Sequence, residues 1–512
     1  MPVLGSFIGS DDLAIAAELT NAMIPMRECF DGIRAVSGQS VQAANLLLRH
    51  CVLTKPIHLL RSLRPSVTDD FAAEFDREAL ECIITTLTLP SPLSAEAQLD
   101  LFLPCRLGGM GYRPASRANR PAFWGSAASS LQFVLEQCDV PDRLTLVSEL
   151  EAIHGNMLNE QNVAPDGIAI METFEETYDY FTGDEVISGL QKLLTVLIED
   201  SLDATRRYRA PDYFIARTNA CRARGAASWL MTIPSTDYPE LCMSNMDFRF
   251  AVRHRMGLLP SDIMPAKCAC GLQLSLQSYD RQANHFQECP YQKRRGADMR
   301  HGMVRDALCA ILRDSGTPCS NEDHFRDEDW PDVEVYFPPC PSLPLPHVIT
   351  DVSVVCPTAR SYLPRAHNPL ACAKSMQETK INRYRHLTVN EAGVSVATSL
   401  PLVFESYGGL APKAITLLGQ VVRAYAQLHN APMSPVKFSQ RLRQRLSIAL
   451  QRGNALIAKL GLGMSWRRPR RFKRPDRAQR QDAPPIRAAG PAGDSDLLDI
   501  RGALQFLGDL NG

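Results

Sequence analysis

Apolar residues recur at helical spacing through the first 260 residues of the chain. The clearest stretch runs from Phe71 to Leu87, where apolar side chains follow a period of about 3.6 residues. Thr68 is placed to cap this helix, and Pro90 and Pro92 are placed to end it. The first half is therefore predicted to be mostly helical. Similar patterns predict helices over 12–30, 41–63, 126–138 and 184–200, while 105–121 is predicted to be a connection and 201–224 has only weak periodicity.

The pattern changes after residue 265. Two β-branched runs, 331–337 and 347–356, are separated by a proline-rich loop and predict strands. With helices expected over 300–314, 369–386 and 411–428 and a strand over 394–404, the order is α-β-β-α-β-α. A further helix is predicted over 434–460, with Ser434 as its cap and Pro435 at its first position. The sequence therefore predicts an α+β protein of several domains.

Composition narrows the class of protein. The chain has 512 residues, of which 45% are apolar, so disorder throughout is excluded. No apolar run reaches the roughly 18–20 residues that a membrane span needs, and the start lacks the basic region of a signal peptide. We therefore expect a soluble, unsecreted protein without a membrane partner. Its 15 cysteines then indicate reduced core residues and a metal site rather than disulfides.

Charge is unevenly distributed. The net charge is -1, but residues 466–480 hold eight basic residues and one Asp, so this stretch is +7 and the remainder is -1 - 7 = -8. Such a segment suits a polyanion or a nuclear-import receptor, and a solvated tail is the alternative. Beyond residue 465 the Pro, Arg, Gly and Ala content predicts disorder.

Three cysteines and a histidine form the best candidate for a metal site. Cys268 and Cys270 precede Gly271, which can adopt the positive φ of a tight knuckle, and His285 and Cys289 are spaced to share one side of a helical turn. The number and types of ligand are those of a structural zinc site. The alternative is two loop cysteines beside an unrelated pair.

Two aspartates and a lysine suggest a hydrolytic site. Metal-dependent cleavage of a phosphodiester needs carboxylates that bind the metal and a cation near the phosphate. Asp332 opens the first predicted strand, and Asp351 lies inside the second, where a carboxylate is costly to bury unless it binds something. Lys374 and Lys380 follow on the next helix, with Tyr384 one turn later. The structural alternative is an ordinary strand-end Asp and surface lysines.

These motifs resemble the C-terminal region of non-LTR retrotransposon polyproteins that carry a restriction-like endonuclease. The similar segments include CACG at 268–271, HFQEC at 285–289, RHGMVRDAL at 300–308, WPDVEV at 330–335, ITDVSV at 349–354, AKSMQETKINRY at 373–384 and FESYGG at 404–409. Upstream, LLLRHCVLTKPIHLLRSL at 46–63, LPCRLGGMGYRPAS at 103–116 and AASWLMTIP at 226–234 resemble the thumb and linker of the same polyproteins.

The resemblance implies a domain organisation. It predicts a palm remnant and thumb-like helices (1–125), a helical linker region (126–264), a CCHC zinc knuckle (265–298), a restriction-like endonuclease domain of PD-(D/E)xK type (299–430), a C-terminal helix (431–464) and a disordered basic tail (465–512).

The resemblance also implies roles for single residues. Asp332 and Asp351 would bind Mg²⁺, Lys380 would be the catalytic lysine moved onto a helix, and Tyr384 its companion. Zn²⁺ would be structural and Mg²⁺ catalytic. Contacts to the nucleic-acid backbone are expected from Arg300, His301, Lys293, Arg294 and Arg295.

The expected function is therefore a nuclear, Mg²⁺-dependent DNA endonuclease. It would nick target DNA to prime reverse transcription, with element RNA and a full-length reverse transcriptase as further partners. Gly9 to Asp12 resembles a polymerase metal site, but too few residues precede it for a palm, and Ser10 is better placed to cap a helix beginning at Asp11. The alternatives are a nucleic-acid-binding remnant that no longer cleaves and a relic without function.

Overall fold

The protein is a mixed α+β molecule that is mostly helical, which confirms the fold class at that level. The structure, a computed structural model, describes residues 2–464 apart from several short stretches and one longer one. Outside the described residues lie 4–5, 8–10, 138–139, 162–188, 260–266, 275–284, 290, 292–294, 322–330, 339–344 and the predicted basic tail, 465–512. No helix in the described part is long and apolar enough to cross a membrane.

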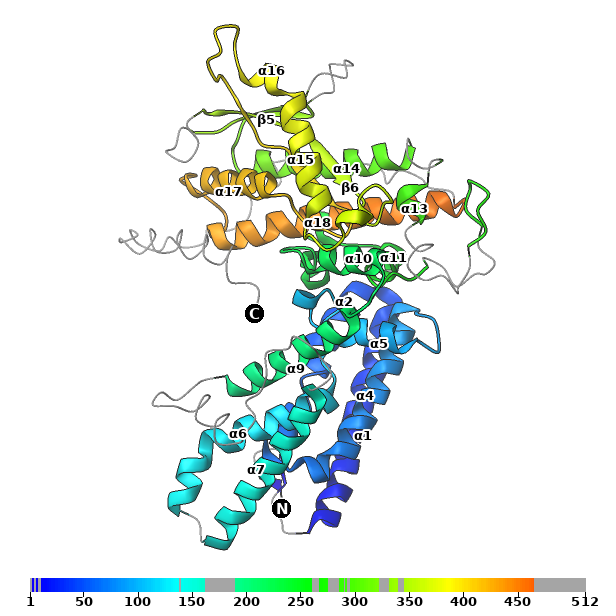
Figure 1. Ribbon diagram of the computed structural model, residues 1–512, viewed down its shortest axis with the longest axis vertical. Helices are drawn as coiled ribbons and strands as arrows, with labels where there is room; N and C mark the ends of the chain where they lie inside the picture. Colours follow the sequence, from blue (N-terminus) through cyan, green and yellow to red (C-terminus); the bar gives the residue numbers. More distant parts are fainter. Residues whose placement is uncertain are drawn as a thin grey trace, which may run out of the picture.

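Two long helices form one side of the helical half. Helices α1 (Asp12–Gln39) and α4 (Pro65–Leu87) lie side by side in the lower part of Figure 1. Each buries an apolar stripe, and the rings of Phe30 and Phe75 meet between them with centroids 5.3 Å apart. This stripe is the 3.6-residue pattern predicted from the sequence.

The starts of both helices differ slightly from the prediction. Asp11 caps α1, because its carboxylate accepts bonds from the backbone amides two and three residues later. The helix therefore begins at Asp12. In α4 Pro65 takes the first position, where its fixed φ suits a helix start. The hydroxyl of Thr68, the predicted cap, instead bonds to the carbonyl of Arg64 inside the first turn.

The predicted helix over 41–63 is interrupted. Helix α2 (Val41–Leu47) continues as a π-helical turn (Leu48–Val52), and α3 (Ile57–Ser62) starts after Pro56. Proline has no amide hydrogen to donate, so Pro56 interrupts the helical hydrogen bonds between the π-helical turn and α3.

A second group of helices packs beside the first. Helices α6 (Ala115–Gln137), α7 (Val140–Gln161) and α9 (Leu190–Arg207) share a core around Trp124. The prediction of a connection up to residue 121 was wrong for its last part. The carboxylate of Asp76 on α4 accepts bonds from the amides of Ala115 (2.6 Å) and Ser116 (2.9 Å), so a neighbouring helix fixes where α6 begins.

Buried arginines join α10 (Asp212–Arg222) and α11 (Asn245–Arg255) to the segment that begins with α5 (Ala95–Phe102). Helix α10 places Arg217 3.0 Å from the carboxylate of Asp100, at the end of α5. Helix α11 places Arg255 3.0 Å from the carbonyl of Gly109. Loss of one partner from a buried ion pair such as Arg217–Asp100 is strongly destabilising, because it leaves a buried charge without compensation.

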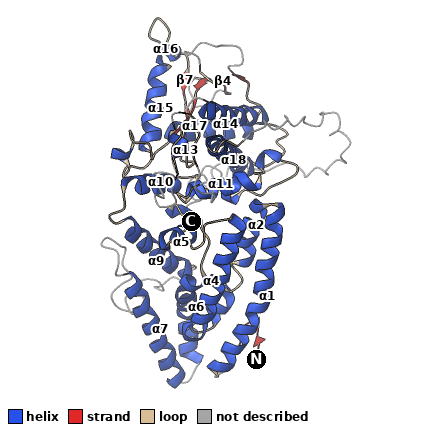
Figure 2. Ribbon diagram, turned by 90° about the vertical axis from the view of Figure 1, so that its right-hand side faces the viewer, coloured by secondary structure: helices blue, strands red, loops and turns tan. Residues whose placement is uncertain are grey.

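Among the residues that the structure describes, the strands form two small sheets at the end of the molecule opposite the N-terminus, apart from the short β1–β2 pair (Figure 2). The larger sheet has the order β3-β4-β5-β7, and the smaller one pairs β6 with β8 in parallel. Their bounds are β1 (Pro2–Val3), β2 (Ser6–Phe7), β3 (Cys319–Asn321), β4 (Val333–Tyr336), β5 (His347–Thr350), β6 (Val352–Val355), β7 (Thr398–Ser399) and β8 (Leu402–Glu405).

The predicted strand over 347–356 is in fact two strands. Strand β5 belongs to the larger sheet and β6 to the smaller one, and Asp351 is the residue between them. The helices predicted over 300–314, 369–386 and 411–428 are present in the predicted order, but strand β3 and helix α16 were not predicted, and the strand predicted over 394–404 is divided between β7 and β8. The helices here are α13 (His285–Glu288), α14 (Arg295–Asp314), α15 (Ala371–Arg383), α16 (Arg385–Thr388), α17 (Pro412–Ala426) and α18 (Pro435–Gly461).

Helix α18 runs through the centre of this half (Figure 1). Ser434 caps it and Pro435 is its first residue, as predicted. Its first half joins the core under the sheets through Leu442 and Leu446, and its last turns join a separate core around Cys268. One helix therefore connects the predicted nuclease to the predicted metal site.

Candidate active site and metal centre

Asp351 is the centre of a buried polar cluster. Its side chain is 7% exposed, and Nζ of Lys380 lies 2.8 Å from Oδ2. The hydroxyl of Tyr384 donates to Oδ1 at 2.7 Å, and Ser353 donates to Oδ2 at 3.1 Å. The change of sheet at Asp351 directs this carboxylate toward α15 and the turn after it. Two strands and one helix thus bring together three residues of the predicted site.

Asp332 lies beside this cluster. Its Oδ2 accepts a bond from the backbone amide of Val352 at 2.6 Å, and Val352 directly follows Asp351. The two aspartates therefore belong to one site. Nε2 of His301, on α14, lies 2.8 Å from the same oxygen. Burial alone would lower the pKa of His301, but the hydrogen bond and charge of Asp332, with the charge of Asp351, raise the pKa overall.

His301 is the residue that sequence reasoning placed differently. It was expected to contact a nucleic-acid backbone, and the structure places it against a carboxylate of the candidate site. No spacing rule in the sequence indicated this pairing, because 31 residues separate the two partners.

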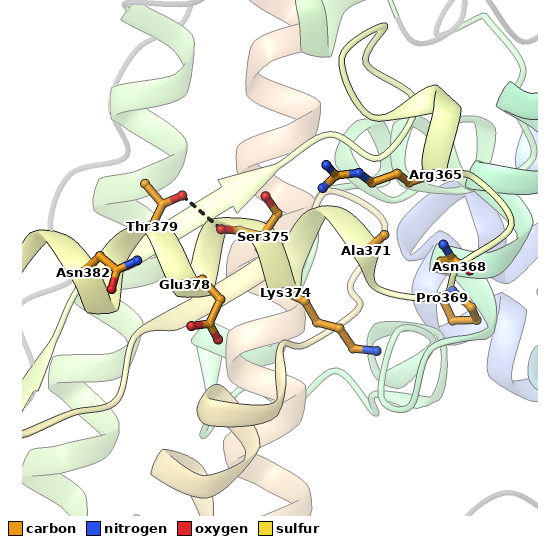
Figure 3. A pocket seen from close by; sticks show the side chains of 9 residues that line it. All are labelled: Arg365, Asn368, Pro369, Ala371, Lys374, Ser375, Glu378, Thr379 and Asn382. Carbon is orange, nitrogen blue, oxygen red and sulfur yellow. Dashed lines mark hydrogen bonds between the residues drawn. The ribbon is translucent and has the colours of Figure 1, made fainter.

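The structure distinguishes the two candidate lysines. Lys380 is 17% exposed and faces Asp351. Lys374, six residues earlier on α15, lines a surface hollow together with Arg365 and Glu378 (Figure 3). Of these two lysines, Lys380 is therefore the one placed to act with Asp351.

Tyr384 is held as a neutral hydrogen-bond donor. It directly follows the last residue of α15 and is 2% exposed. Burial, followed by its bond to the Asp351 carboxylate, raises the pKa of the Tyr384 hydroxyl. A phenol that keeps its proton can orient the carboxylate without adding negative charge.

The predicted ligands Cys268, Cys270, His285 and Cys289 form a cluster that could hold a metal ion such as zinc. Their four ligand atoms lie within 4.8 Å of one another. The Sγ atoms of Cys268 and Cys289 are 3.7 Å apart, and Sγ of Cys270 is 3.3 Å from Nε2 of His285. Tetrahedral zinc with bonds of about 2.3 Å to sulfur places its sulfur ligands about 3.8 Å apart, so the donor set fits.

The local backbone explains how the cluster forms. Gly271 adopts a φ of +93°, as the predicted knuckle requires. The carbonyl of Cys268 accepts a bond from the Gly271 amide at 2.8 Å, which closes the turn. His285 begins α13 and Cys289 follows its last residue, so both face the knuckle. Burial lowers the pKa of His285, which favours the neutral ring that a metal binds.

The cluster is attached to the end of α18. The amide of Ala269 donates to the carbonyl of Gly461 at 2.8 Å, and Cys268 and Cys289 pack against Ala455 and Ala458. Metal bound here would therefore stabilise the last turns of α18 as well as the knuckle.

The predicted nucleic-acid contacts have different outcomes. Arg300 is 5% exposed and bonds to Asn454 at 3.0 Å and to Gln287, so it is a buried structural residue rather than a surface contact. Burial lowers its pKa to about 10. Lys293 and Arg294 lie outside the described residues, and Arg295 is the first residue of α14.

Asp11 and Asp12 serve the helical half. Asp11 caps α1, and Asp12 pairs with Arg64 at 2.6 Å. Asp11 and Asp12 therefore each have a structural partner, a helix end for Asp11 and the side chain of Arg64 for Asp12.

No protein-family model matches the chain, and no curated protein is significantly similar to it in sequence. The resemblance to retrotransposon endonucleases therefore remains a prediction from motifs.

Proposed function

We propose that this protein is a Mg²⁺-dependent DNA endonuclease. The observation that carries the proposal is the meeting of Asp332, Asp351 and Lys380, two acids and a cation from three separate elements. A buried cluster of this kind costs folding free energy unless a ligand or a reaction uses it. Phosphodiester hydrolysis uses all three groups.

The two carboxylates suit a hard divalent cation. Asp332 and Asp351 offer oxygen ligands, which Mg²⁺ prefers, and both are largely buried. Bound Mg²⁺ would polarise the scissile phosphate and lower the pKa of a water molecule.

The surrounding side chains have separate tasks. Lys380 places a positive charge where negative charge develops on the phosphate. Tyr384 and Ser353 orient Asp351, and His301 orients Asp332. These three are positioning residues, because each acts through a carboxylate.

The wider role follows from the sequence resemblance. We propose nicking of target DNA to prime reverse transcription, in the nucleus, with element RNA and a full-length reverse transcriptase as partners. The Cys268 cluster would be the structural zinc site of this protein. The reverse transcriptase partner would supply polymerisation.

The alternative is a nucleic-acid-binding remnant without cleavage. It is favoured by the direct 2.8 Å ion pair between Lys380 and Asp351, since a pair that never opens would exclude a metal from that oxygen. The same experiment decides between the two.

The experiment is nicking of supercoiled plasmid by the full chain in Mg²⁺ or Mn²⁺. Asp351→Asn is expected to abolish nicking, and the matched control Asp306→Asn, at an exposed position on α14, is expected to leave it intact. Binding of plasmid without nicking in either metal would reject the endonuclease and support the remnant.

A further inference from the structure

A large cavity lies between the helical half and α18, and the proposed nuclease site contributes no residue to it. Its volume is about 730 Å³, and its walls come from α3, α6, α9, the loop 223–228 and the first turns of α18. Leu60, Phe102 and Met231 are among its apolar lining residues. Cavities of this size accept a ligand of one or two nucleotides rather than a folded partner.

The lining is strongly cationic. Nine Lys and Arg side chains line the cavity against one carboxylate, that of Glu199. Glu199 pairs with Arg106 at 3.1 Å, and Arg222 pairs with Asp203 at 2.6 Å. Most of the positive charge is therefore not balanced within the cavity.

Within the described part of the chain, three of these cations form no ion pair, and two of them, Arg113 and Lys192, are exposed to solvent. Among the residues that the structure describes, the side chains of Arg113, Lys192 and Arg443 form no hydrogen bond or ion pair. Arg443 is partly buried, and burial together with the charge of Arg224 lowers its pKa to about 10. The partly buried Arg443 beside Arg224 is the like-charge contact here that a bound anion would relieve.

A fourth arginine supplies an independent observation. Arg49 is 7% exposed and lines the cavity, with its guanidinium 4.8 Å from the ring centroid of Tyr112. One amino group donates to the carbonyl of Met110 at 2.6 Å, but the buried Nε has no partner among the described residues. Buried donors without partners are rare in folded proteins and indicate a missing acceptor.

We infer that this cavity binds the backbone of a single-stranded nucleic acid, with phosphates at Arg113, Lys192 and Arg443 and a base against the apolar wall. Single strands combine exposed phosphates with exposed bases, which matches a lining of cations and apolar side chains. A duplex stacks its bases inside and presents mainly charge, so it would not use the apolar wall. The site is separate from the proposed nuclease and does not depend on it.

The test is binding of a fluorescent oligothymidylate of about 12 nucleotides to the full chain, without magnesium. Arg113→Glu with Arg443→Glu is expected to weaken binding at least about tenfold. The slope of log Kd against log salt should fall by about 0.7 for each phosphate that the variant no longer neutralises. The matched control is Arg77→Glu with Lys413→Glu, which changes the net charge equally outside the cavity and should leave the affinity unchanged.

Glutamine substitutions at the same two positions separate the other outcomes. Arg113→Gln with Arg443→Gln removes repulsion and should keep the thermal stability of the chain, while it still weakens binding. If neither the glutamate nor the glutamine double variant at Arg113 and Arg443 changes the affinity, the inference is overturned. It would also be overturned if a DNA duplex bound as tightly as the oligothymidylate and the variants weakened both affinities equally. Competition by poly-glutamate as strong as that by unlabelled oligothymidylate would overturn it too. Because cleavage is not measured, an inactive nuclease does not affect this result.

Discussion

The ammonium group of Lys380 lies 2.8 Å from the carboxylate of Asp351, across 29 residues of sequence. The pairing depends on the exchange of sheets between β5 and β6, which directs Asp351 toward α15. This contact brings an acid and a cation together as a candidate site.

Replacing Lys380 by Met should lower the rate of plasmid nicking by about 100-fold or more, because the charge beside the phosphate is removed. Lys374→Met is the matched control on the same helix, since Lys374 lines a surface hollow (Figure 3). Its rate should equal that of the unaltered chain. Equal rates in the two variants would contradict the role assigned to Lys380.

Removing one ligand from the cysteine cluster should remove the metal. The chain is expected to contain about one zinc ion per molecule, and Cys289→Ser should lose most of it. Elemental analysis measures this, with Cys51→Ser as the control at an exposed cysteine outside the cluster. A chelator should also lower Tm, since the knuckle bonds to α18. Full zinc content in Cys289→Ser would rule out this ligand set.

Adding one methyl group at Gly453 should destabilise the fold. A Cβ there would lie 2.9 Å from Cβ and 3.0 Å from Cα of Arg300, where α14 crosses α18. We expect Gly453→Ala to lower the free energy of unfolding by about 1–3 kcal/mol, measured by denaturant titration.

Gly419→Ala is the control for this change. A Cβ at Gly419, on α17, would meet nothing within 4 Å. Because alanine favours helix, the control should be neutral or more stable by up to about 1 kcal/mol. A similar destabilisation in both variants would mean that the contact with Arg300 is not the cause.

His254 should make the stability of the fold fall in mild acid. Its ring stacks on Tyr407 with centroids 4.3 Å apart. Burial, followed by the charges of Arg300 and Arg217, lowers its pKa from 6.5 to about 3. The unfolded chain therefore binds a proton first as the pH falls, so this contribution is complete above pH 6.5 and is lost between there and pH 3.

The measurement is the free energy of unfolding at several pH values. From pH 7 to pH 5 we expect His254 to account for a loss of about 2 kcal/mol. His254→Phe keeps an aromatic ring and should have a flatter slope over this range, whatever its absolute stability. His386→Phe, at an exposed position, should keep the original slope. An unchanged slope in His254→Phe would contradict the assignment.

The sequence determined the types of element and the residues with reactive chemistry. Caps, prolines and apolar spacing act over a few residues, so α18 could be predicted almost to its ends, from Ser434 onward. The knuckle at Gly271 is equally local. Where a distant residue intervenes, as Asp76 does at the start of α6, the local pattern was insufficient.

Tertiary structure alone decided which residues meet. It chose Lys380 over Lys374, placed His301 against Asp332, and buried Arg300 between Gln287 and Asn454. It also gathered cations from α6, α9 and α18 around one cavity that no segment of sequence indicated. The physical reason is that such contacts depend on the packing of elements far apart in the chain, whereas sequence patterns record only what neighbouring residues impose on one another.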